Sequence, residues 1–199
     1  MEAAEALFAE KGFNGTSVRD IAEKAGINLA MISYYFGSKD KLLEALFVYR
    51  GEQTKLVLED IVLKKDISAL DKVFLMIDHY IEKVFGQKNF HRIMVREQSL
   101  NATTAVSAEI VHLKKRNYAV INRLLQDGQK SGEFKKGVDM GLMMTTLFGT
   151  VNHLVTTQYY YKQLNNLEHL SDEAFQKQLQ KKLTQHLKFL FKTVLTNEA

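Results

Sequence analysis

Hydrophobic residues recur at spacings of three and four along almost the whole chain, which is the periodicity of amphipathic α-helices. Between residues 16 and 37 this pattern breaks into two short pieces. The first starts at Ser17, where Asp20 completes a capping box, and ends at Gly26. The second starts after Asn28, a residue type that caps helices through its side-chain oxygen. Two short helices joined by a tight turn predict a helix-turn-helix.

On either side of this motif the pattern predicts further helices. One at the N-terminus ends at Gly12, and the others lie near residues 39–64, 68–86, 88–99, 104–131, 138–163 and 172–196. We expect an all-α fold with two domains. Residues 1–47 are expected to form a three-helix helix-turn-helix domain, and residues 48–199 a C-terminal helical domain for regulation and dimerisation.

The second short helix of the motif has two distinct faces. At about 100° per residue, Ile32 and Phe36 point inward, whereas Ala30, Ser33 and Tyr34 point outward. A face of small and hydrogen-bonding side chains fits a DNA major groove, where hydroxyl groups bond to base edges or phosphates. Periodicity by itself leaves a second interpretation open, in which this is only a short surface helix.

The composition narrows the class of protein. The 199 residues include no cysteine, which excludes disulfides, cysteine metal ligands and thiol nucleophiles. They include no proline either, where about ten are usual for this length, so long helices can run unbroken. Residues 140–161 carry no formal charge and are long enough to span a bilayer. Their many threonines and other polar residues make insertion unfavourable, so we expect a buried soluble helix and no membrane partner.

The charge is distributed unevenly. A net charge of +4 is compatible with binding nucleic acid. Residues 1–47, however, contain five Lys or Arg and seven Asp or Glu, a net charge of −2. The positive excess lies later, notably on the lysines between residues 177 and 192. Net charge therefore does not favour DNA binding by the motif, and only the placement of single side chains can.

The segment LFAEKGFNGTSVRDIAEKAGINLAMISYYFGSKDKLLEAL resembles the N-terminal domain of the TetR family of bacterial transcriptional regulators. The resemblance covers roughly residues 3–47 and includes LFAEKGF, GTSVRDIAEKAG and YYFGSKDKLL in that order. The later helices match only in layout. The resemblance implies a homodimeric transcriptional regulator, most simply a repressor, that binds a palindromic operator in double-stranded DNA and responds to a small molecule.

The resemblance also implies roles for single residues. Thr16 and Ser17, at a helix N-terminus, would bind a phosphate through backbone N–H groups and hydroxyls. Tyr35 and Lys39 match positions that commonly contact phosphate. The variable positions that face the groove are occupied by Asn28, Leu29, Ala30, Ser33 and Tyr34.

The chain departs from a common pattern of the family at three of these positions. Lysine and glycine are frequent where Leu29 and Ala30 stand, and histidine is frequent where Tyr34 stands. Leu29 removes a phosphate or guanine contact and offers an apolar surface to thymine methyl groups. We therefore expect few direct contacts between side chains and bases, made mainly by Ser33 and Tyr34.

Family members usually begin several residues before the position of Met1, with a basic stretch that leads into the first helix. Met1 stands where they have an apolar residue inside that helix. We therefore expect either that the gene starts late or that the chain has lost its start. Without the basic stretch, phosphate contacts and DNA affinity would both fall.

The last two long helices carry continuous apolar stripes. The resemblance implies that they pair with the same helices of a second subunit in a four-helix bundle, as a two-fold operator requires. The alternative is that the stripes only fill the core of one chain. The residues expected at the dimer interface are Met144, Phe148, Val151, Val155, Leu179, Leu183, Leu187 and Leu190.

The resemblance further implies a pocket in the C-terminal domain for a small-molecule effector, which we expect to be largely apolar. Aromatic residues and methionines at helical spacing are usually core, and this alternative stays open for each candidate. His153 differs from the others as a titratable group in an uncharged helix. The candidate lining residues are Phe74, His79, Tyr80, Phe90, Met94, Tyr118, Phe148, His153 and Tyr159.

The chain carries no recognisable catalytic motif. His79 and Glu82 stand in the reverse order of the di-iron Glu-x-x-His motif, and no phosphate loop or serine elbow is present. We expect no catalytic residue, metal or cofactor, and a cytoplasmic location. The alternative function is a helical small-molecule-binding or protein-interaction module with weakened or lost DNA binding, motivated by the acidic N-terminal domain. Salt-dependent affinity for DNA distinguishes the two.

Overall fold

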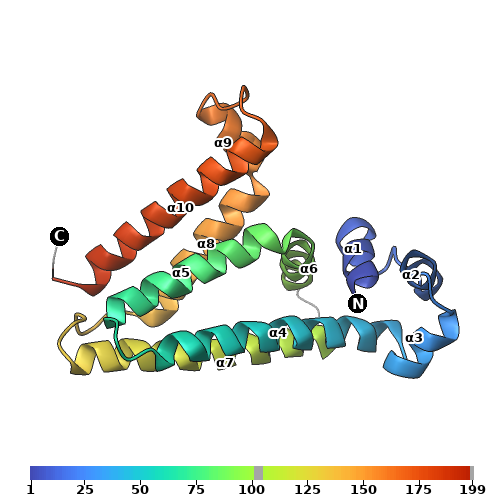
Figure 1. The fold of residues 1–199 in the computed structure, drawn as a ribbon, viewed down its shortest axis with the longest axis horizontal. Coiled ribbons are helices and arrows are strands. Elements are labelled where there is room, and N and C mark those ends of the chain that lie inside the picture. The colour runs from blue at the N-terminus through green and yellow to red at the C-terminus, as the bar shows by residue number, and fades with distance from the viewer. Residues whose placement is uncertain (101–104, 198–199) are drawn as a thin grey trace. The chain divides into compact units, whose positions relative to one another are not determined.

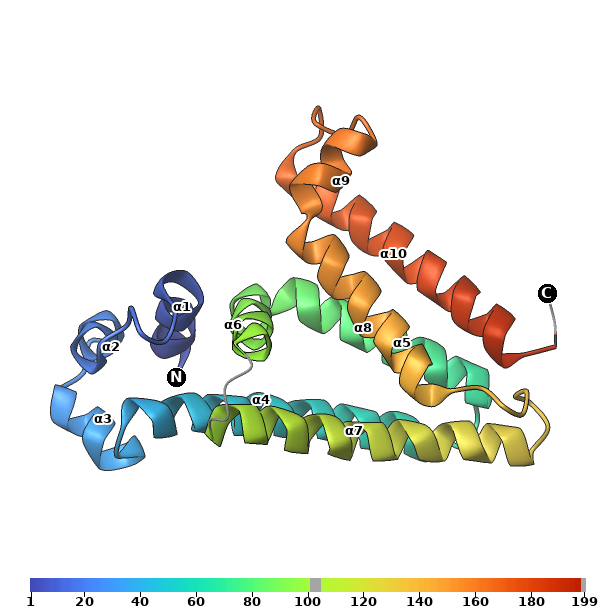
Figure 2. The same cartoon turned by 180° about the vertical axis from the view of Figure 1, so that it is seen from behind.

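The computed structural model describes residues 1–100 and 105–197 (Figures 1 and 2). In chain order, the helices of these residues are α1 (Glu2–Lys11), α2 (Val18–Ala25), α3 (Leu29–Phe36), α4 (Lys39–Leu63), α5 (Ala69–Gly86), α6 (Lys88–Ser99), α7 (Ala105–Lys130), α8 (Met140–Thr156), α9 (Gln158–Leu164) and α10 (Asp172–Leu195). None of the described residues lies in a strand, and the predicted all-α fold is confirmed.

The predicted helix over residues 138–163 is wrong, because two helices, α8 and α9, occupy this range. α8 ends at Thr156, and the next residue, Thr157, donates a hydrogen bond from Oγ1 to the carbonyl oxygen of His153 at 2.7 Å. Threonine hydroxyls that bond to preceding carbonyls offer the backbone an alternative to a straight helix. No helix of the described residues is long and apolar enough to cross a membrane.

By its internal packing the chain forms two compact units. Unit 1 comprises Met1–Glu59 and Gln87–Ala119, and unit 2 comprises Asp60–Gly86 and Val120–Ala199. α4 and α7 are continuous helices that contribute residues to both units. The predicted domains, residues 1–47 and 48–199, are continuous segments, whereas each unit combines two segments. The predicted domain boundary therefore stays a prediction.

Unit 1 is built around α1, which packs beside α6 (Figure 2). Its core includes Phe47 of α4 and Phe90 of α6, whose ring centroids are 5.1 Å apart. Arg96 of α6 donates a hydrogen bond from one guanidinium nitrogen to the carbonyl oxygen of Phe8, 3.0 Å away, near the C-terminal end of α1. α1 is thereby fixed as a brace for the helix-turn-helix.

A partly buried ion pair joins α1 to α4 in the same unit. Arg50 donates from two guanidinium nitrogens to one carboxylate oxygen of Glu5, at 3.0 and 2.8 Å. The two side chains are only 19% and 9% exposed. Removing one partner of such a pair leaves a buried charge uncompensated, so the pair fixes the position of α1 on α4.

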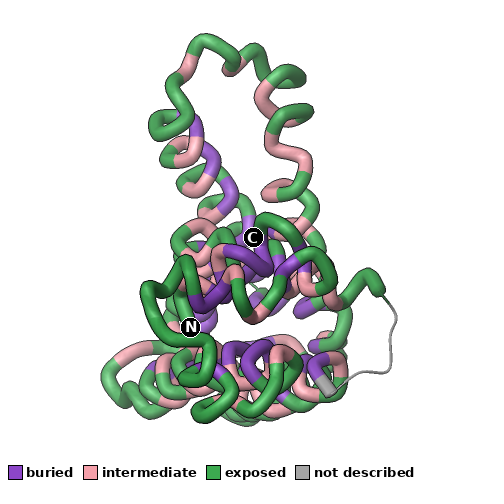
Figure 3. Tube along the Cα trace, turned by 90° about the vertical axis from the view of Figure 1, so that its right-hand side faces the viewer, coloured by how far each residue is buried: buried purple, intermediate pink, exposed green. Residues whose placement is uncertain are grey.

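In unit 2, α5 and α8 both pack against α10. An ion pair of 2.6 Å between Asp78 of α5 and Lys188 of α10 ties two of these helices together. The carboxylate of Glu133 accepts hydrogen bonds from the backbone N–H groups of Ala69 and Leu70 and so caps the start of α5. α9 contains no buried residue and appears in green and pink at the top of Figure 3.

Candidate DNA-contacting surface and effector cavity

The helix-turn-helix is positioned by short-range hydrogen bonds that the sequence predicted. Ser17 and Asp20 form the capping box of α2, with bonds of 3.0 and 3.1 Å. Gly26 adopts the left-handed conformation (φ 64°, ψ 32°), and Ile27 N–H donates to the carbonyl oxygen of Ala22 at 3.0 Å. This bond closes the end of α2 in the manner of a Schellman motif and directs the chain into α3.

Asn28 caps α3 as predicted, because its Oδ1 accepts a hydrogen bond from Ala30 N–H at 2.9 Å. Ile27, in the turn between α2 and α3, is not buried. Ile27 follows the glycine but remains 41% exposed, so it does not seal the turn against the core.

α3 presents the predicted outward face to solvent. Ile32 is 3% exposed and anchors the helix, whereas Tyr34 is 83% exposed. Tyr35 is 66% exposed, and its ring meets that of Tyr34 edge-on with centroids 5.1 Å apart. Asn28, Leu29, Ala30 and Ser33 are also exposed. The structure thus brings together the predicted groove-facing residues on one accessible surface, and their contacts with DNA stay a prediction.

Thr16 occupies a position that does not fit its predicted phosphate contact. Its side chain is 1% exposed, and its hydroxyl lies 2.7 Å from the carbonyl oxygen of Gly12 and 3.2 Å from that of Leu7. Its backbone N–H bonds to the carbonyl oxygen of Phe13 at 3.3 Å. Thr16 therefore closes the end of α1 rather than facing a ligand.

Ser17 is exposed, but its backbone N–H already donates to the Asp20 carboxylate. This hydrogen bond, together with the one that the Ser17 side chain makes, lowers the pKa of Asp20 below its usual value. An ionised carboxylate at the start of α2 occupies the place that an anion would take. The predicted phosphate contact of Ser17 is thus confined to its hydroxyl group.

Lys39 is half-buried and holds unit 1 together. Its ammonium group donates to the carbonyl oxygens of Phe13 and Thr16, both at 2.9 Å, and lies 4.2 Å from the centroid of the Phe13 ring. Two of its three N–H groups are therefore used inside the protein. The exposed cations of the helix-turn-helix are instead Lys11, Arg19, Lys24 and Lys41.

One exposed residue of α3 was missed by the sequence reasoning. Met31 is 41% exposed and lies on the outward side, between the directions of Tyr34 and Tyr35. The angular rule of about 100° per residue places it there. The sequence therefore contained the signal for this residue.

The nine predicted effector residues are divided between the two units, and their contact with an effector stays a prediction. Phe90 and Met94 belong to the core of unit 1, because α6 packs against α1. Tyr118, His153 and Tyr159 are exposed. Phe90, Met94 and Tyr118 belong to unit 1, whereas His153 and Tyr159 belong to unit 2.

The other four candidates lie in unit 2. The rings of Tyr80 and Phe148 meet edge-on with centroids 4.9 Å apart, and the Tyr80 hydroxyl lies 3.4 Å from Asn152 Oδ1. Burial raises the pKa of Tyr80 above its ordinary value. Burial also lowers the pKa of His79, with a further contribution from the charge of Lys83.

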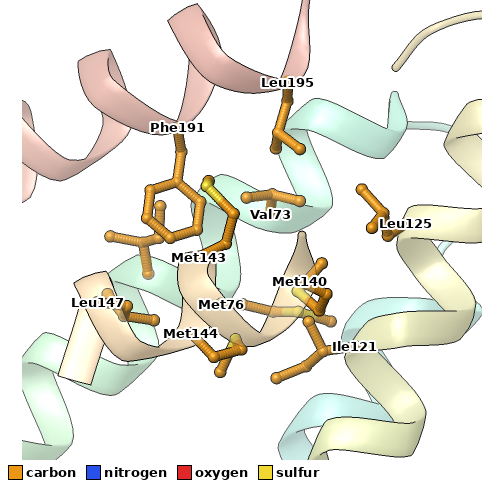
Figure 4. Close-up of a pocket in the computed structure, with 11 residues that line it drawn as sticks. Val73, Met76, Ile121, Leu125, Met140, Met143, Met144, Leu147, Phe191 and Leu195 are labelled. Atoms are coloured by element: carbon orange, nitrogen blue, oxygen red, sulfur yellow. The ribbon is translucent and has the colours of Figure 1, made fainter. Parts of the chain in front are cut away.

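Unit 2 encloses a different apolar cavity, of about 30 Å³, between α5, α7, α8 and α10 (Figure 4). None of the nine predicted residues lines it. Four of its lining residues are methionines, and the full set is Val73, Met76, Ile77, Ile121, Leu125, Met140, Met143, Met144, Leu147, Phe191 and Leu195. Methionine is unbranched and adapts its shape readily, so this cavity can widen by side-chain rotation.

Several residues predicted at the dimer interface are buried within a single chain. Val151, Leu179, Leu183 and Leu187 are at most 4% exposed. Met144 lines the cavity, and Phe148 packs on Tyr80. Val155 and Leu190 are half-buried. For the buried residues the alternative interpretation is correct, because their stripe fills the core of the chain.

The large apolar residues of α8 and α10 that are exposed are not among those predicted at the dimer interface. Leu142 of α8 is 66% exposed, and Phe189 and Val194 of α10 are 68% and 39% exposed.

The described residues contain no group of His, Asp or Glu side chains that could hold a metal ion.

Comparison with known families gives two matches that together span most of the chain. The family described as "Bacterial regulatory proteins, tetR family" matches residues 1–46. The family described as "YsiA-like protein, C-terminal region" matches residues 53–192.

Individual relatives agree with these matches. The fatty acid metabolism regulator protein of Bacillus subtilis is 28% identical over 177 residues, which are 88% of this chain and 90% of the relative. The crystal structure of the regulator FadR from Bacillus subtilis in complex with stearoyl-CoA superposes with a TM-score of 0.68 at 26% identity, covering 94% of each chain. A putative fatty acid metabolism regulator of Clostridium perfringens shares the fold, with a TM-score of 0.72, 20% identity and coverage of 94% and 95%.

Proposed function

The chain belongs to the tetR family of bacterial regulatory proteins, and we propose that it is a repressor released from DNA by an effector of the long-chain acyl-coenzyme A class. As a member of this family, it is a homodimeric DNA-binding transcriptional regulator that responds to a ligand. The identity of the effector is the new element of the proposal. We assign the protein no catalytic step and place its action at DNA in the cytoplasm.

The methionine-lined cavity of unit 2 is the observation that carries the proposal. Its lining is apolar throughout, and each methylene group of an acyl chain that leaves water for such a site gains about 0.8 kcal/mol. A long chain therefore supplies a large driving force in a site that offers no hydrogen bond. The relative that was crystallised with stearoyl-CoA supports the same class of ligand.

The size of the cavity links binding to a conformational change. About 30 Å³ is close to the volume that one water molecule occupies in the liquid, far less than an acyl chain needs. The chain can enter only if the side chains of α5, α8 and α10 move apart. A ligand that binds only the opened form shifts the population toward that form.

The opened form needs a lower affinity for DNA if the ligand is to act as an inducer. α4 and α7 are continuous helices with residues in both units, so movement of unit 2 residues is coupled to the unit that contains α3 through unbroken helix. A coupling free energy of about 1–3 kcal/mol is ordinary for such a switch.

The second subunit is proposed to cover the exposed apolar residues of α8 and α10. Leu142, Phe189 and Val194 leave large apolar surfaces open in the single chain. Burying such residues against the same residues of a second copy gives a two-fold interface. This arrangement replaces the predicted interface of Leu179, Leu183 and Leu187, which the chain itself buries.

Release of a fluorescent operator duplex tests the effector class. We expect stearoyl-CoA to lower the fluorescence anisotropy of the protein–operator complex to that of free DNA, whereas coenzyme A alone leaves it unchanged. The same anisotropy with and without stearoyl-CoA would refute the effector class but leave the DNA-binding assignment intact. A duplex that is never bound, even at low salt, would favour the alternative of a module that has lost DNA binding.

A further inference from the structure

α3 contains no charged side chain, and we propose that the protein selects its operator by contacting thymine methyl groups through Leu29 and Met31. The inference rests on the proposed function, because it requires that α3 enters the major groove. It names the chemical feature of DNA that the groove-facing surface recognises.

Leu29 and Met31 are the exposed apolar side chains in the first turn of α3, at the N-terminal end where recognition helices contact base edges. They leave the helix in different directions, about 200° apart, so each would meet its own base pair. Each is 41% exposed, whereas Ile32, the next apolar residue, is 3% exposed. Single exposed apolar side chains are normal on protein surfaces, so the exposure of Leu29 and Met31 only makes them available for contact, and the lack of charged side chains on α3 is what favours an apolar one.

The usual hydrogen-bond readers of bases are missing from α3. Guanine is read most often by Arg or Lys, and the helix has neither. Adenine is read by Asn or Gln through both the oxygen and the nitrogen of the side-chain amide. Asn28 is the amide residue at this surface, and its oxygen already accepts the capping bond from Ala30 N–H at 2.9 Å. The capping bond uses one of the two lone pairs of that oxygen and holds the amide at the start of α3, which restricts how it can approach an adenine.

The hydroxyl groups that remain discriminate weakly. Ser33 and Tyr34 are exposed, and a hydroxyl both donates and accepts, so it can bond to more than one kind of base. In the major groove, the 5-methyl group of thymine is the apolar feature that distinguishes one base pair from another. Leu29 and Met31 have the chemistry to recognise it, and A·T pairs are preferred where they contact the groove.

Replacing thymine by uracil tests the inference, because it removes only the methyl group. An operator is first selected from a random duplex library with the complete protein, and each thymine is then replaced in turn. At the contacted positions we expect a loss of affinity of about fourfold for one methyl group and about 16-fold when both half-sites are changed. Replacement at other thymines leaves the affinity unchanged.

Two alanine variants show which side chain contacts each thymine methyl group. Leu29→Ala or Met31→Ala should bind the thymine and uracil duplexes equally at the position that the lost side chain contacted. Leu56→Ala is the matched control, since Leu56 is 64% exposed on α4 in the same unit and should keep the full difference. Far-ultraviolet circular dichroism of each variant checks that the fold is retained.

Three outcomes separate the inference from the proposed function. Loss of affinity with uracil that disappears in Leu29→Ala or Met31→Ala supports the inference. Tight binding of the selected operator with no effect of any uracil overturns the inference alone and transfers specificity to hydroxyl contacts or DNA shape. Absence of selective binding to any duplex overturns the proposed function, and the inference with it.

Discussion

The ammonium group of Lys39 lies 4.2 Å from the centre of the Phe13 ring and donates a 2.9 Å hydrogen bond to the carbonyl oxygen of the same residue. Lys39 is the first residue of α4, and Phe13 follows α1, so this contact joins the segments on either side of α2 and α3. A lysine expected to bind phosphate is thus a structural clamp in the protein without DNA. Its third N–H group is the part that a phosphate could still use.

Lys39→Ala should lower the free energy of unfolding by about 1–3 kcal/mol, because it removes two hydrogen bonds from a charged donor and a cation–π contact. Chemical unfolding followed by circular dichroism measures this loss. Lys41→Ala is the control, since Lys41 is exposed and forms a surface ion pair with Glu44, and it should change stability by less than about 1 kcal/mol. Equal stability of the Lys39 and Lys41 variants would contradict the clamp.

The capping box of α2 should make stability depend on pH in a defined direction. The Ser17 N–H and hydroxyl bonds lower the pKa of Asp20 in the folded state. A carboxyl group of this kind contributes stability above its unfolded pKa of about 3.9 and loses it as the pH falls through the folded pKa. Asp20→Ala should therefore be less stable than the parent at about pH 7, and the difference should narrow below about pH 4.

Urea unfolding of both proteins across this pH range measures the difference. The alanine variant also changes helix propensity, but that effect does not vary with pH. A difference that stays constant from about pH 7 to about pH 3 would mean that the carboxylate of Asp20 does not stabilise the folded state.

Filling the cavity of unit 2 should block the effector without affecting DNA binding. Met76 lines the cavity and is 6% exposed, and Met76→Phe adds volume there. We expect the parent affinity for DNA and a stearoyl-CoA concentration for half-release that rises about tenfold, which corresponds to about 1.4 kcal/mol of lost binding. Leu75→Phe makes the same kind of change at the adjacent, 37% exposed position and should respond like the parent. If both variants need the same stearoyl-CoA concentration for half-release, the effector does not bind in this cavity.

Substitution of Phe189 should weaken dimer assembly, whereas substitution of Leu187 should weaken folding. Phe189 is 68% exposed, so Phe189→Glu places a charge on the proposed interface and should shift sedimentation from dimer to monomer. Leu187 is fully buried, and Leu187→Ala should cost about 2–5 kcal/mol of folding free energy through the cavity that it leaves. A Phe189→Glu protein that stays dimeric at the concentrations where the parent is dimeric would place the interface elsewhere.

The features that could be predicted from the sequence depend on neighbours within a few residues. Ser17, Gly26 and Asn28 determine the ends of α2 and α3 through bonds that span two to five residues, and all three behave as predicted. The break at Thr157 depends on a choice between helical and non-helical backbone at one residue, where φ is −109° and ψ is 26°. Periodicity alone does not resolve that choice, and α8 and α9 were therefore predicted as one helix.

The features that were missed depend on packing between distant segments. Thr16 is buried because its hydroxyl reaches the carbonyl of Leu7, nine residues earlier, at the end of another helix. Phe90 lies in the core of unit 1 because α6 packs against α1, a pairing that helical periodicity does not specify. The apolar stripe of α10 could face its own chain or a second one, and Leu187 shows that it faces its own chain.

Selection from a random DNA library with the purified protein tests the central claim most directly. A homodimer of the tetR family that places two α3 helices in successive major grooves should enrich an inverted repeat, with half-site centres about 34–36 Å apart or a multiple of that distance. Its affinity should fall steeply as salt rises, because phosphate contacts release counterions. A folded, effector-free dimer that enriches no inverted repeat at low salt would contradict the assignment as a sequence-specific repressor.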